Sequence, residues 1–485
     1  NPMGAHHAWG RTYKDLWQRY HNMKGEKQRF QNGFDCQGLW VEVEVEKELG
    51  FKSKKDIEAY GIAEFVEKCK ERVLKYAAIQ TEQSKRLAYF MDWEHSYFTM
   101  SDQNYYTIWY FLKVCFERGW IYKGHDSVPW CPRCETAISQ HEMLTEDYKE
   151  VTHKSVYLRL PLVGRKDEYL LVWTTTPWTI PANICVAADQ EIDYSLVEFE
   201  GKKYWVAQKL VEKVFLNDSG QARMTKCIKT VKGKKLAGLK YRGAFDSLDE
   251  VKKAADNQKF HTVVLTDPFL MPITTDEGTG MVHTAVSAGE EDFKLGKKLG
   301  LPMIPVIADN ADYLPGLGFL SGQNAKKHPE IILDYLEKEG FAFKIENYLH
   351  RYPACWRCKT ELVWKVADEW YISMDAPSQT RNSKLETRNK TLREQLVETA
   401  KKINWLPEFG MERELDWLKN MHDWLISKKN RYWGLALPIY ECGNCHNFEV
   451  IEGKGELKKR AVSGWEEFEG HSPHKPFIDK VKIKC

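Results

Sequence analysis

The 485-residue chain lacks a dominant charge, a long hydrophobic run and a recognisable leader. Its 71 Lys and Arg residues against 69 Asp and Glu residues leave a net charge of +2, which excludes a uniformly polycationic nucleic-acid binder but allows a local basic surface. No apolar stretch approaches the ~20 residues that span a membrane, and the first ten residues have neither the charged nor the apolar region of a signal peptide. We therefore expect a cytoplasmic protein of about three domains that does not enter a membrane.

Internal repeats and low-complexity tracts are missing too, and the apolar spacing changes twice along the chain. Apolar residues recur every three or four positions, as in amphipathic helices, over residues 11–24, 56–86 and 103–118. Between residues 155 and 345, short β-branched runs such as 155–160 and 169–174 predict a domain rich in strands. The helical spacing then returns over residues 391–403 and 411–428. This order indicates one catalytic domain interrupted by a large insertion.

Six of the twelve cysteines form three Cys-x-x-Cys pairs, which are Cys131/Cys134, Cys355/Cys358 and Cys442/Cys445. A structural zinc site takes four thiolates, usually from two such turns. The other interpretations are a redox pair, which would open a helix after a strand, and unliganded thiols. The first two pairs flank the predicted insertion, so we expect them to bind Zn²⁺ together, although the spacing alone allows other pairings among the three.

The third pair has one cysteine downstream of it, Cys485, which is the last residue of the sequence. Three thiolates do not complete a structural zinc site. His446 is an alternative fourth ligand, but we expect it on the loop surface and favour a further cysteine beyond Cys485. Because the first residue is also not Met, we expect this chain to be a fragment of a longer protein.

Two adjacent histidines, His6 and His7, stand before the first predicted helix. Alone, such a pair is more often a surface feature, but histidine beside a helix N-terminus can bind phosphate, because free N–H groups and the helix dipole point there. The run from His6 to the segment Asn32-Gly33-Phe34-Asp35-Cys36 resembles the start of class I aminoacyl-tRNA synthetases of the isoleucyl group. The resemblance implies that His7, with His6 beside it, contacts ATP phosphates and that Asp35 holds the amino group of the amino acid.

Two segments of the predicted insertion resemble the editing domain of the same family. Residues 171–183 resemble its threonine-rich peptide, and residues 276–293 resemble its second signature. The resemblance implies hydrolysis of a mischarged aminoacyl ester by a water that threonine hydroxyls position, with Asp292 holding the substrate ammonium group. The implied site residues are Thr174, Thr175, Thr176, Asn183, His283 and Asp292. The run Thr174–Thr176 and a buried His283 would each more often be structural alone, but the family order of the segments favours the functional interpretation.

A basic stretch lies between these two segments. Residues 219–245 contain no acidic residue and eight basic ones, Arg223, Lys226, Lys229, Lys232, Lys234, Lys235, Lys240 and Arg242. Contact with the acceptor end of tRNA is one interpretation, and a solvated surface is the alternative.

The resemblance covers essentially the whole chain and implies an α/β fold, in which a Rossmann-like catalytic domain is split by a strand-rich, barrel-like editing insertion with zinc knuckles. The implied domains are a first catalytic half (1–125), an outgoing connection with a zinc knuckle (126–154), the editing domain (155–345), a returning zinc knuckle (346–365), the second catalytic half (366–440) and a truncated second zinc-binding insertion (441–485).

The implied activity is that of an isoleucine-specific ligase. ATP with Mg²⁺ would activate isoleucine, the aminoacyl group would pass to tRNA(Ile), and the insertion would hydrolyse Val-tRNA(Ile). We expect a monomer with one or two structural Zn²⁺ sites. The sequence contains no Lys-Met-Ser-Lys-Ser loop, which the family uses in adenylation. We therefore expect the isolated chain to activate isoleucine poorly while retaining ester hydrolysis.

Two alternatives stay open. A leucyl- or valyl-type synthetase is one, because Gln37 and Trp40 depart from the isoleucyl pattern, although editing peptides of those types place Arg after the threonines and this chain has Thr176-Pro177-Trp178. A free-standing hydrolase of mischarged tRNA is the other, and it would have no use for the His7 and Asp35 segments.

Overall fold

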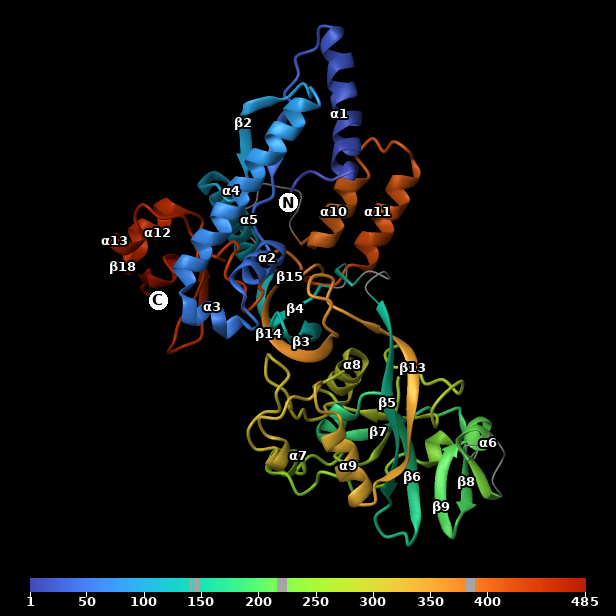
Figure 1. Cartoon of the computed structure of the whole chain (residues 1–485). Helices are drawn as coiled ribbons and strands as arrows, with labels where there is room; N and C mark the ends of the chain where they lie inside the picture. The colour runs from blue at the N-terminus through green and yellow to red at the C-terminus, as the bar shows by residue number, and fades with distance from the viewer. Residues whose placement is uncertain (140–141, 144–147, 216–224, 380–388) are drawn as a thin grey trace. The chain divides into compact units, whose positions relative to one another are not determined.

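The computed structural model describes residues 1–139, 142–143, 148–215, 225–379 and 389–485 (Figure 1). The chain divides into two compact units, one made of Asn1–Gly124 with Glu369–Cys485 and the other of His125–Asp368. The second unit is continuous in sequence and interrupts the first. Strands β3 (Ile121–Cys131) and β14 (Val363–Ile372) carry the chain across the two boundaries.

The first unit is mainly helical. Its described helices are α1 (Ala5–Met23), α2 (Leu39–Leu49), α3 (Lys54–Tyr60), α4 (Ile62–Arg86), α5 (Asp102–Glu117), α10 (Leu392–Ala400), α11 (Phe409–Asn420), α12 (Lys454–Arg460) and α13 (Trp465–Phe468). Its described strands are β1 (Gln31–Phe34), β2 (Asp92–Phe98), β15 (Trp424–Leu425), β16 (Ile439–Glu441), β17 (Phe448–Val450), β18 (Ala461–Ser463) and β19 (Lys482–Ile483). β1 and β2 pair in parallel. In a second sheet, β14 lies between β15 and β3.

The second unit is mainly strands. Its described strands are β4 (Thr136–Ala137), β5 (Tyr148–Pro161), β6 (Glu168–Thr174), β7 (Cys185–Ala188), β8 (Asp193–Phe199), β9 (Lys202–Ala207), β10 (Lys226–Lys232), β11 (Val263–Leu265), β12 (Met281–Thr284) and β13 (Ala342–Pro353). Its described helices are α6 (Val211–Val214), α7 (Asp249–Ala254), α8 (Glu290–Leu299) and α9 (Glu330–Lys338).

Nine of the described strands of the second unit form one sheet, with β6 at its centre. β6 pairs antiparallel with β5 and parallel with β9 and β12, and β12 also pairs antiparallel with β7. The run Leu170–Val172 in β6 is completely buried, as expected for a strand covered on both faces. The predictions of strands over 155–160 and 169–174 are confirmed by β5 and β6.

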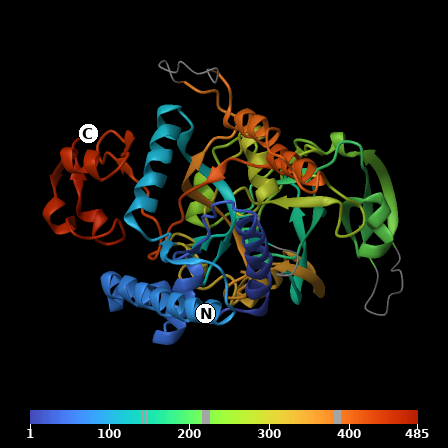
Figure 2. The same ribbon diagram turned by 90° about the horizontal axis from the view of Figure 1, so that it is seen from above.

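The aromatic helix α5 forms the core of the first unit. Ser101 caps its N-terminus by accepting a hydrogen bond from the Asn104 amide. Trp109 is completely buried in a cluster with C-terminal residues Ile451, Leu457, Phe468, Ile478 and Val481. Figures 1 and 2 show the C-terminal segment beside α5. The apolar face of the helix predicted over 103–118 is therefore a packing surface.

Three helix predictions are corrected by the structure. The helix predicted over 56–86 breaks at Gly61, whose φ of 113° is open to glycine but strained for other residues. The helix predicted over 411–428 ends at Asn420, because Trp424 and Leu425 instead pair with β14. The helix predicted over 11–24 begins at Ala5, so the two histidines lie inside its first turn and not before it.

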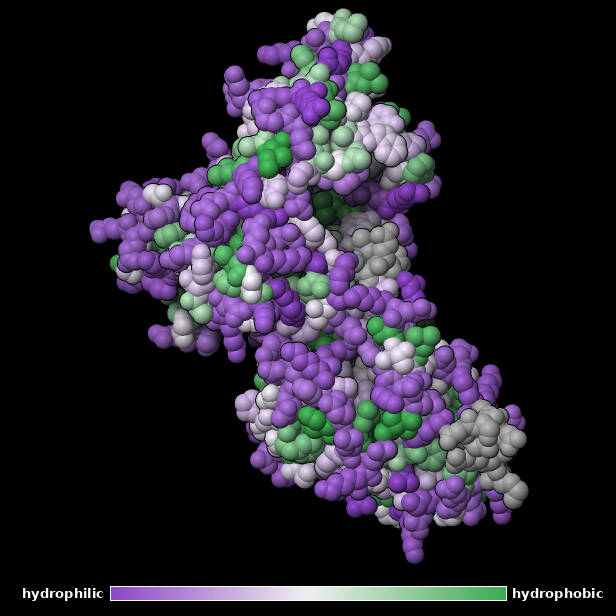
Figure 3. All heavy atoms as spheres, in the orientation of Figure 1, coloured by the Kyte–Doolittle hydropathy of each residue, from purple (hydrophilic) through white to green (hydrophobic). Residues whose placement is uncertain are grey.

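Hydrophilic side chains cover most of the face in Figure 3, and hydrophobic side chains appear there as scattered patches. This distribution is usual for a folded protein surface. Among the residues that the structure describes, we find no helix with the length and apolarity needed to cross a bilayer.

A buried ion cluster joins α2 and α3 to the loop before β16. Lys54 Nζ lies 2.5 Å from Glu42 Oε2 and 2.8 Å from Glu46 Oε1, and all three side chains are almost completely buried. Glu42 Oε1 also accepts hydrogen bonds from the backbone amides of Tyr432 and Trp433, at 2.8 and 2.7 Å. Because each carboxylate oxygen of Glu42 has a partner, the cluster fixes the position of residues that are nearly 400 positions apart in sequence.

Substituting Lys54 by Met should destabilise the first unit strongly, because two buried carboxylates would lose their cation. The expected loss is about 3–5 kcal/mol in the free energy of unfolding, measured by urea denaturation. Lys47→Met is the matched control, since Lys47 pairs with Glu44 at 2.8 Å on the surface and should cost less than about 1 kcal/mol. Equal losses in the two variants would contradict a structural role for the cluster.

Candidate functional site

The threonine-rich segment lies where β6 ends inside the sheet of the second unit. Val282 of β12 pairs with Trp173, directly before the threonines. The Thr174 hydroxyl accepts a hydrogen bond from the Thr176 amide at 3.2 Å and lies 3.2 Å from the Thr176 hydroxyl. Thr174 is buried, whereas Thr175 and Thr176 are half-buried. The strand therefore presents two threonines at a partly open edge of the core.

A chain of hydrogen bonds connects this segment to Asn183 and His283. The His283 Nε2 atom lies 3.0 Å from the Thr179 hydroxyl, and His283 Nδ1 lies 2.7 Å from Asn183 Nδ2. The Thr179 hydroxyl donates to the Thr176 carbonyl at 2.8 Å. The structure thus brings Asn183, His283 and the threonine-rich segment together.

His283 is buried and both its ring nitrogens are engaged. Burial lowers the pKa of His283 to about 4, so the ring is neutral near pH 7. A neutral imidazole has one donor and one acceptor nitrogen, and both are used by protein partners. His283 therefore holds the segment in place and has no free nitrogen with which to act as a general base.

Asp292 stands in the first turn of α8, close to the end of β12. Its Oδ2 atom accepts a hydrogen bond from the Ala285 amide at 3.2 Å. A Cβ at Gly289 would lie 2.5 Å from this oxygen, so the glycine leaves room for the carboxyl to fold back toward β12. Desolvation raises the pKa of Asp292 to about 7, and the hydrogen bond from Ala285 works against that rise. A cationic group beside Asp292 would therefore find a carboxyl that ionises readily on binding it.

Four cysteines meet at the base of the second unit. The ligand atoms of Cys131, Cys134, Cys355 and Cys358 all lie within 4.8 Å of one another, and Cys131 Sγ is 3.4 Å from Cys358 Sγ. With Zn–S bonds of about 2.3 Å, the sulfurs of a tetrahedral site stand about 3.8 Å apart. The donor set and its spacing therefore fit a structural zinc ion. The pairing of the first two Cys-x-x-Cys turns follows from this geometry.

The third Cys-x-x-Cys pair forms a separate group in the first unit. Cys442, Cys445 and Cys485 have sulfurs within 4.8 Å of one another, and Cys445 Sγ is 3.7 Å from Cys485 Sγ. His446 is not among these ligand atoms, and its side chain is 78% exposed beside Glu441. Three thiols are one ligand short of a closed structural site.

His6 and His7 lie exposed in the first turn of α1. His7 Nδ1 accepts a hydrogen bond from the Gly4 amide at 3.2 Å, which leaves Nε2 as the donor nitrogen of a neutral ring. Partial burial, followed by the proximity of His6 and Arg11, lowers the pKa of His7. A donor nitrogen beside a helix N-terminus can bind an anionic group.

Asp35 follows β1 and its carboxylate is exposed. It makes no hydrogen bond or ion pair with any residue that the structure describes. The next residue is tightly held, because the Trp433 indole donates to the Cys36 carbonyl at 2.6 Å and the Trp433 carbonyl accepts from the Gly38 amide at 3.2 Å. The ion cluster at Glu42 therefore holds Trp433, and Trp433 holds the loop that presents Asp35.

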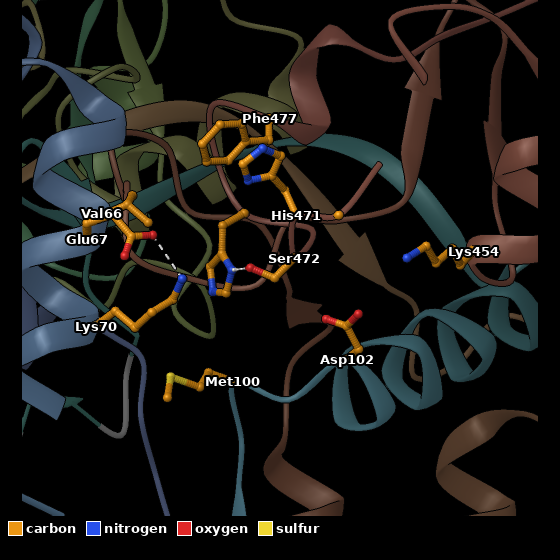
Figure 4. A pocket seen from close by; sticks show the side chains of 11 residues that line it. Val66, Glu67, Lys70, Met100, Asp102, Lys454, His471, Ser472 and Phe477 are labelled. Carbon is orange, nitrogen blue, oxygen red and sulfur yellow. Dashed lines mark hydrogen bonds and ion pairs between the residues drawn. The ribbon is translucent and has the colours of Figure 1, made fainter. Parts of the chain in front are cut away.

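The first unit also contains a cavity of about 340 Å³ (Figure 4). It is lined by α4, the start of α5 and the segment 470–477. His474 forms part of its wall, stacks on Trp433 with ring centroids 4.7 Å apart and contacts the Tyr105 hydroxyl through Nε2. Burial lowers the pKa of His474 to about 4. No residue predicted from the sequence to act in a site lines this cavity.

Sequence reasoning missed several residues that support the predicted sites. No role was predicted for Trp433 and Tyr241, which lie outside the segments that carry the predicted site residues. Thr179 lies inside the threonine-rich segment but was given no role, and the short stretch around His474 carries no periodic signal. Of the basic stretch, Arg223 lies outside the described residues, and the lysines of β10 are exposed at the edge of the sheet. Lysines on an edge strand also discourage pairing with other chains, which fits the solvated-surface interpretation.

Comparison with known proteins places the chain in a family. The family model described as "tRNA synthetases class I (I, L, M and V)" matches residues 3–484, and the chain belongs to that family. Proteins named isoleucine–tRNA ligase from Methanocaldococcus jannaschii, Methanothermobacter marburgensis and Clostridium novyi are 36%, 37% and 36% identical to it, each over 99% of the chain. The chain spans 45%, 42% and 43% of the length of these relatives.

A solved structure described as "The crystal structure of GlLeuRS-CP1" covers 40% of this chain and 99% of its own, with 13% identity and a TM-score of 0.29. A likeness this weak carries no argument about fold or function.

The depressed pKa of His283 predicts a specific pH dependence of stability. The unfolded chain takes up a proton on this histidine below about pH 6.5, whereas the folded chain does so only near pH 4, so stability falls as the pH drops through this window. The loss is about 3 kcal/mol in full.

Urea unfolding at pH 7 and pH 5 measures about 2 kcal/mol of this loss, because pH 5 still lies above the folded pKa of about 4. His283→Gln should be less sensitive to the change of pH than the parent chain. Asp292 titrates in the opposite sense but is present in both proteins, so it cancels in the comparison. An identical pH dependence in the parent and His283→Gln would contradict a buried neutral histidine.

Proposed function

We propose that this chain is part of an isoleucine–tRNA ligase. Its first unit would activate isoleucine with ATP and transfer it to tRNA(Ile), and its second unit would hydrolyse Val-tRNA(Ile). The observation that carries the proposal is the identity of 36% over 99% of the chain to a protein named isoleucine–tRNA ligase. The arrangement of Asn183, His283 and the threonine-rich segment supports hydrolysis as the task of the second unit.

The need for hydrolysis follows from energetics. A binding pocket gains only about 1–3 kcal/mol from one methylene group, a limit for which isoleucine against valine in isoleucyl enzymes is itself the known example. A pocket that accepts isoleucine therefore also activates valine at a significant rate. A second site that admits valine but not isoleucine removes the wrong product.

In the proposed hydrolysis, water attacks the carbonyl carbon of the ester that joins valine to the terminal ribose. The carbon–oxygen bond to the ribose breaks, the ribose oxygen takes a proton, and free valine leaves. Hydroxyls of Thr175 and Thr176 are suited to hold the water, because their side chains are half-buried at the open edge of β6. Proton transfer is assigned to the neighbouring ribose hydroxyl and not to His283, whose nitrogens are both engaged.

Asp292 is proposed to bind the ammonium group of the wrong amino acid. A bound ammonium would lower the pKa of the carboxyl, and the N-terminus of α8 favours its ionised form. The contact is the same for valine and isoleucine, so it would supply binding and orientation, while the size of the pocket supplies selectivity.

For the first unit, we propose that His7, with His6, contacts ATP phosphates and that Asp35 binds the amino group of isoleucine. An exposed carboxylate without a protein partner is suited to an ammonium ligand, and a donor nitrogen beside a helix N-terminus is suited to phosphate. ATP would bring Mg²⁺ with it as part of the substrate.

Zinc is proposed as a structural ion at Cys131, Cys134, Cys355 and Cys358. It would hold the two ends of the second unit together as a tetrathiolate centre. A second ion at Cys442, Cys445 and Cys485 would need one more ligand.

The family match extends over both units, which favours a ligase over a free-standing hydrolase. The names of the relatives favour the isoleucyl type over the leucyl and valyl types.

Hydrolysis is tested with this chain by incubating it with Val-tRNA(Ile) and Ile-tRNA(Ile). The chain should deacylate the valyl ester and spare the isoleucyl ester. Asp292→Ala should reduce deacylation of Val-tRNA(Ile) about 10- to 100-fold, the value of one charge-assisted hydrogen bond. Glu291→Ala removes the neighbouring acid of the same helical turn and should leave the rate close to that of the parent chain. Equal rates in the parent and Asp292→Ala would remove Asp292 from the site.

Zinc binding is tested by elemental analysis of the purified chain. Cys355→Ser should contain one zinc ion fewer than the parent and should unfold at a lower temperature, because three thiolates hold the ion poorly. Cys227→Ser is the matched control, since Cys227 is exposed on β10 and belongs to neither cysteine group. A Cys355→Ser chain with the full zinc content of the parent would rule out this site.

A further inference from the structure

The side-chain amide of Asn183 has a defined orientation because one of its neighbours can only accept. Asn183 Nδ2 lies 3.1 Å from the Cys185 carbonyl oxygen, which has no proton to give. The NH₂ group must therefore face Cys185, and Oδ1 must face the opposite way, toward the Tyr241 hydroxyl at 2.5 Å. Tyr241 is accordingly the donor in that contact.

The same orientation decides which nitrogen of His283 carries the proton. The second proton of Asn183 Nδ2 points at His283 Nδ1, 2.7 Å away, so Nδ1 must be the unprotonated nitrogen. The proton lies on Nε2 and is donated to the Thr179 hydroxyl at 3.0 Å. Thr179 in turn donates to the Thr176 carbonyl, so each donor in the chain has one acceptor.

We infer that Tyr241 is a positioning residue of the proposed editing site: its hydroxyl orients the Asn183 amide, and this amide selects the Nε2–H form of His283 that holds the threonine-rich segment. This inference rests on the proposed function for its catalytic consequence, but the order of the hydrogen bonds stands without it. Tyr241 acts through Asn183 and His283, and it contacts no reacting atom.

The surroundings of Tyr241 support this role. Its side chain is buried, and its ring stacks on His261 with centroids 4.9 Å apart. His261 lies in turn 3.1 Å from an Asp246 carboxylate oxygen. The backbone of Tyr241 is also held, by a bridge to Leu162 next to β5. The phenol therefore cannot turn its hydroxyl away from Asn183 without disturbing two neighbouring segments.

Removing the Tyr241 hydroxyl leaves a buried amide oxygen without a donor, which costs more than the loss of an average hydrogen bond. The amide can recover a donor only by turning over, which would place Oδ1 against His283 Nδ1. That arrangement requires a proton on Nδ1 and takes the proton from Nε2. The Thr179 contact is then lost or reversed.

The decisive experiment records the ring ¹⁵N shifts of His283 in chain labelled with ¹⁵N-histidine. The parent should show the Nε2–H form alone, and Tyr241→Phe should show a mixture with the Nδ1–H form. Deacylation of Val-tRNA(Ile) by Tyr241→Phe should fall about tenfold in kcat, with KM changed less than twofold. An unchanged His283 pattern in Tyr241→Phe would overturn the inference, whatever the rate.

Tyr194→Phe is the matched control. Tyr194 is equally buried in the same sheet and donates to the Gly280 carbonyl at 2.6 Å, next to β12. This variant loses that bond and the one the hydroxyl accepts from the Asp189 amide at 3.1 Å, but it should keep the Nε2–H form of His283. A shift of the His283 pattern as large as that in Tyr241→Phe would attribute the effect to general loosening and overturn the inference.

If Tyr241→Phe does not fold, Asn183→Asp tests the same donor and acceptor directions in the hydrogen bonds of Asn183 and His283. A carboxylate can accept but cannot donate, so His283 should then carry a proton on Nδ1, and retention of the parent pattern would overturn the inference. The NMR result is independent of the proposed function. If the parent chain fails to hydrolyse Val-tRNA(Ile), the proposed function fails, whereas the ¹⁵N pattern of the variants still decides the role of Tyr241.

Discussion

Four cysteine side chains hold the two ends of the second unit in one place, and its internal geometry builds on that constraint. Cys131 and Cys358 are more than 220 residues apart in sequence, yet their sulfurs are 3.4 Å apart. Between them the chain forms one sheet whose central strand, β6, ends at the threonine-rich segment. Four clustered thiolates would repel one another, so a shared cation would make this closure favourable.

Both units use buried polar groups to define position. In the first unit, Glu42 binds Lys54 and two backbone amides and thereby places Trp433 against the loop that carries Asp35. In the second unit, Asn183 uses its amide oxygen and both its amide protons between Tyr241, Cys185 and His283. Buried networks of this kind are favourable only when every member has a partner. That requirement permits one arrangement, whereas apolar packing alone would tolerate several.

Motifs in the sequence predict many residues of the candidate site. The Cys-x-x-Cys pairs, the threonine-rich segment and His283 were identified from residue type, spacing and resemblance, and the strands over 155–160 and 169–174 from β-branched runs. The helix predicted over 411–428 was wrong past Asn420, because pairing of Trp424 and Leu425 with β14 outweighs local helical spacing. The start of α1 was placed too late, since the histidines of its first turn carry no apolar signal.

Residue type and spacing along the chain were sufficient to indicate which chemical groups this protein carries, because knuckles, turns and strands are local features. The sequence predicts, through the resemblance, that Asn183 and His283 belong to one kind of site. Only the tertiary structure decided that His283 has no free nitrogen and that Tyr241, Lys54 and Trp433 support the two sites. The roles of Tyr241 and Trp433 arise from contacts between residues that are 58 and 391 positions apart, at Tyr241–Asn183 and Trp433–Glu42 respectively. Such contacts depend on how the segments pack together, and no local pattern in the chain encodes them.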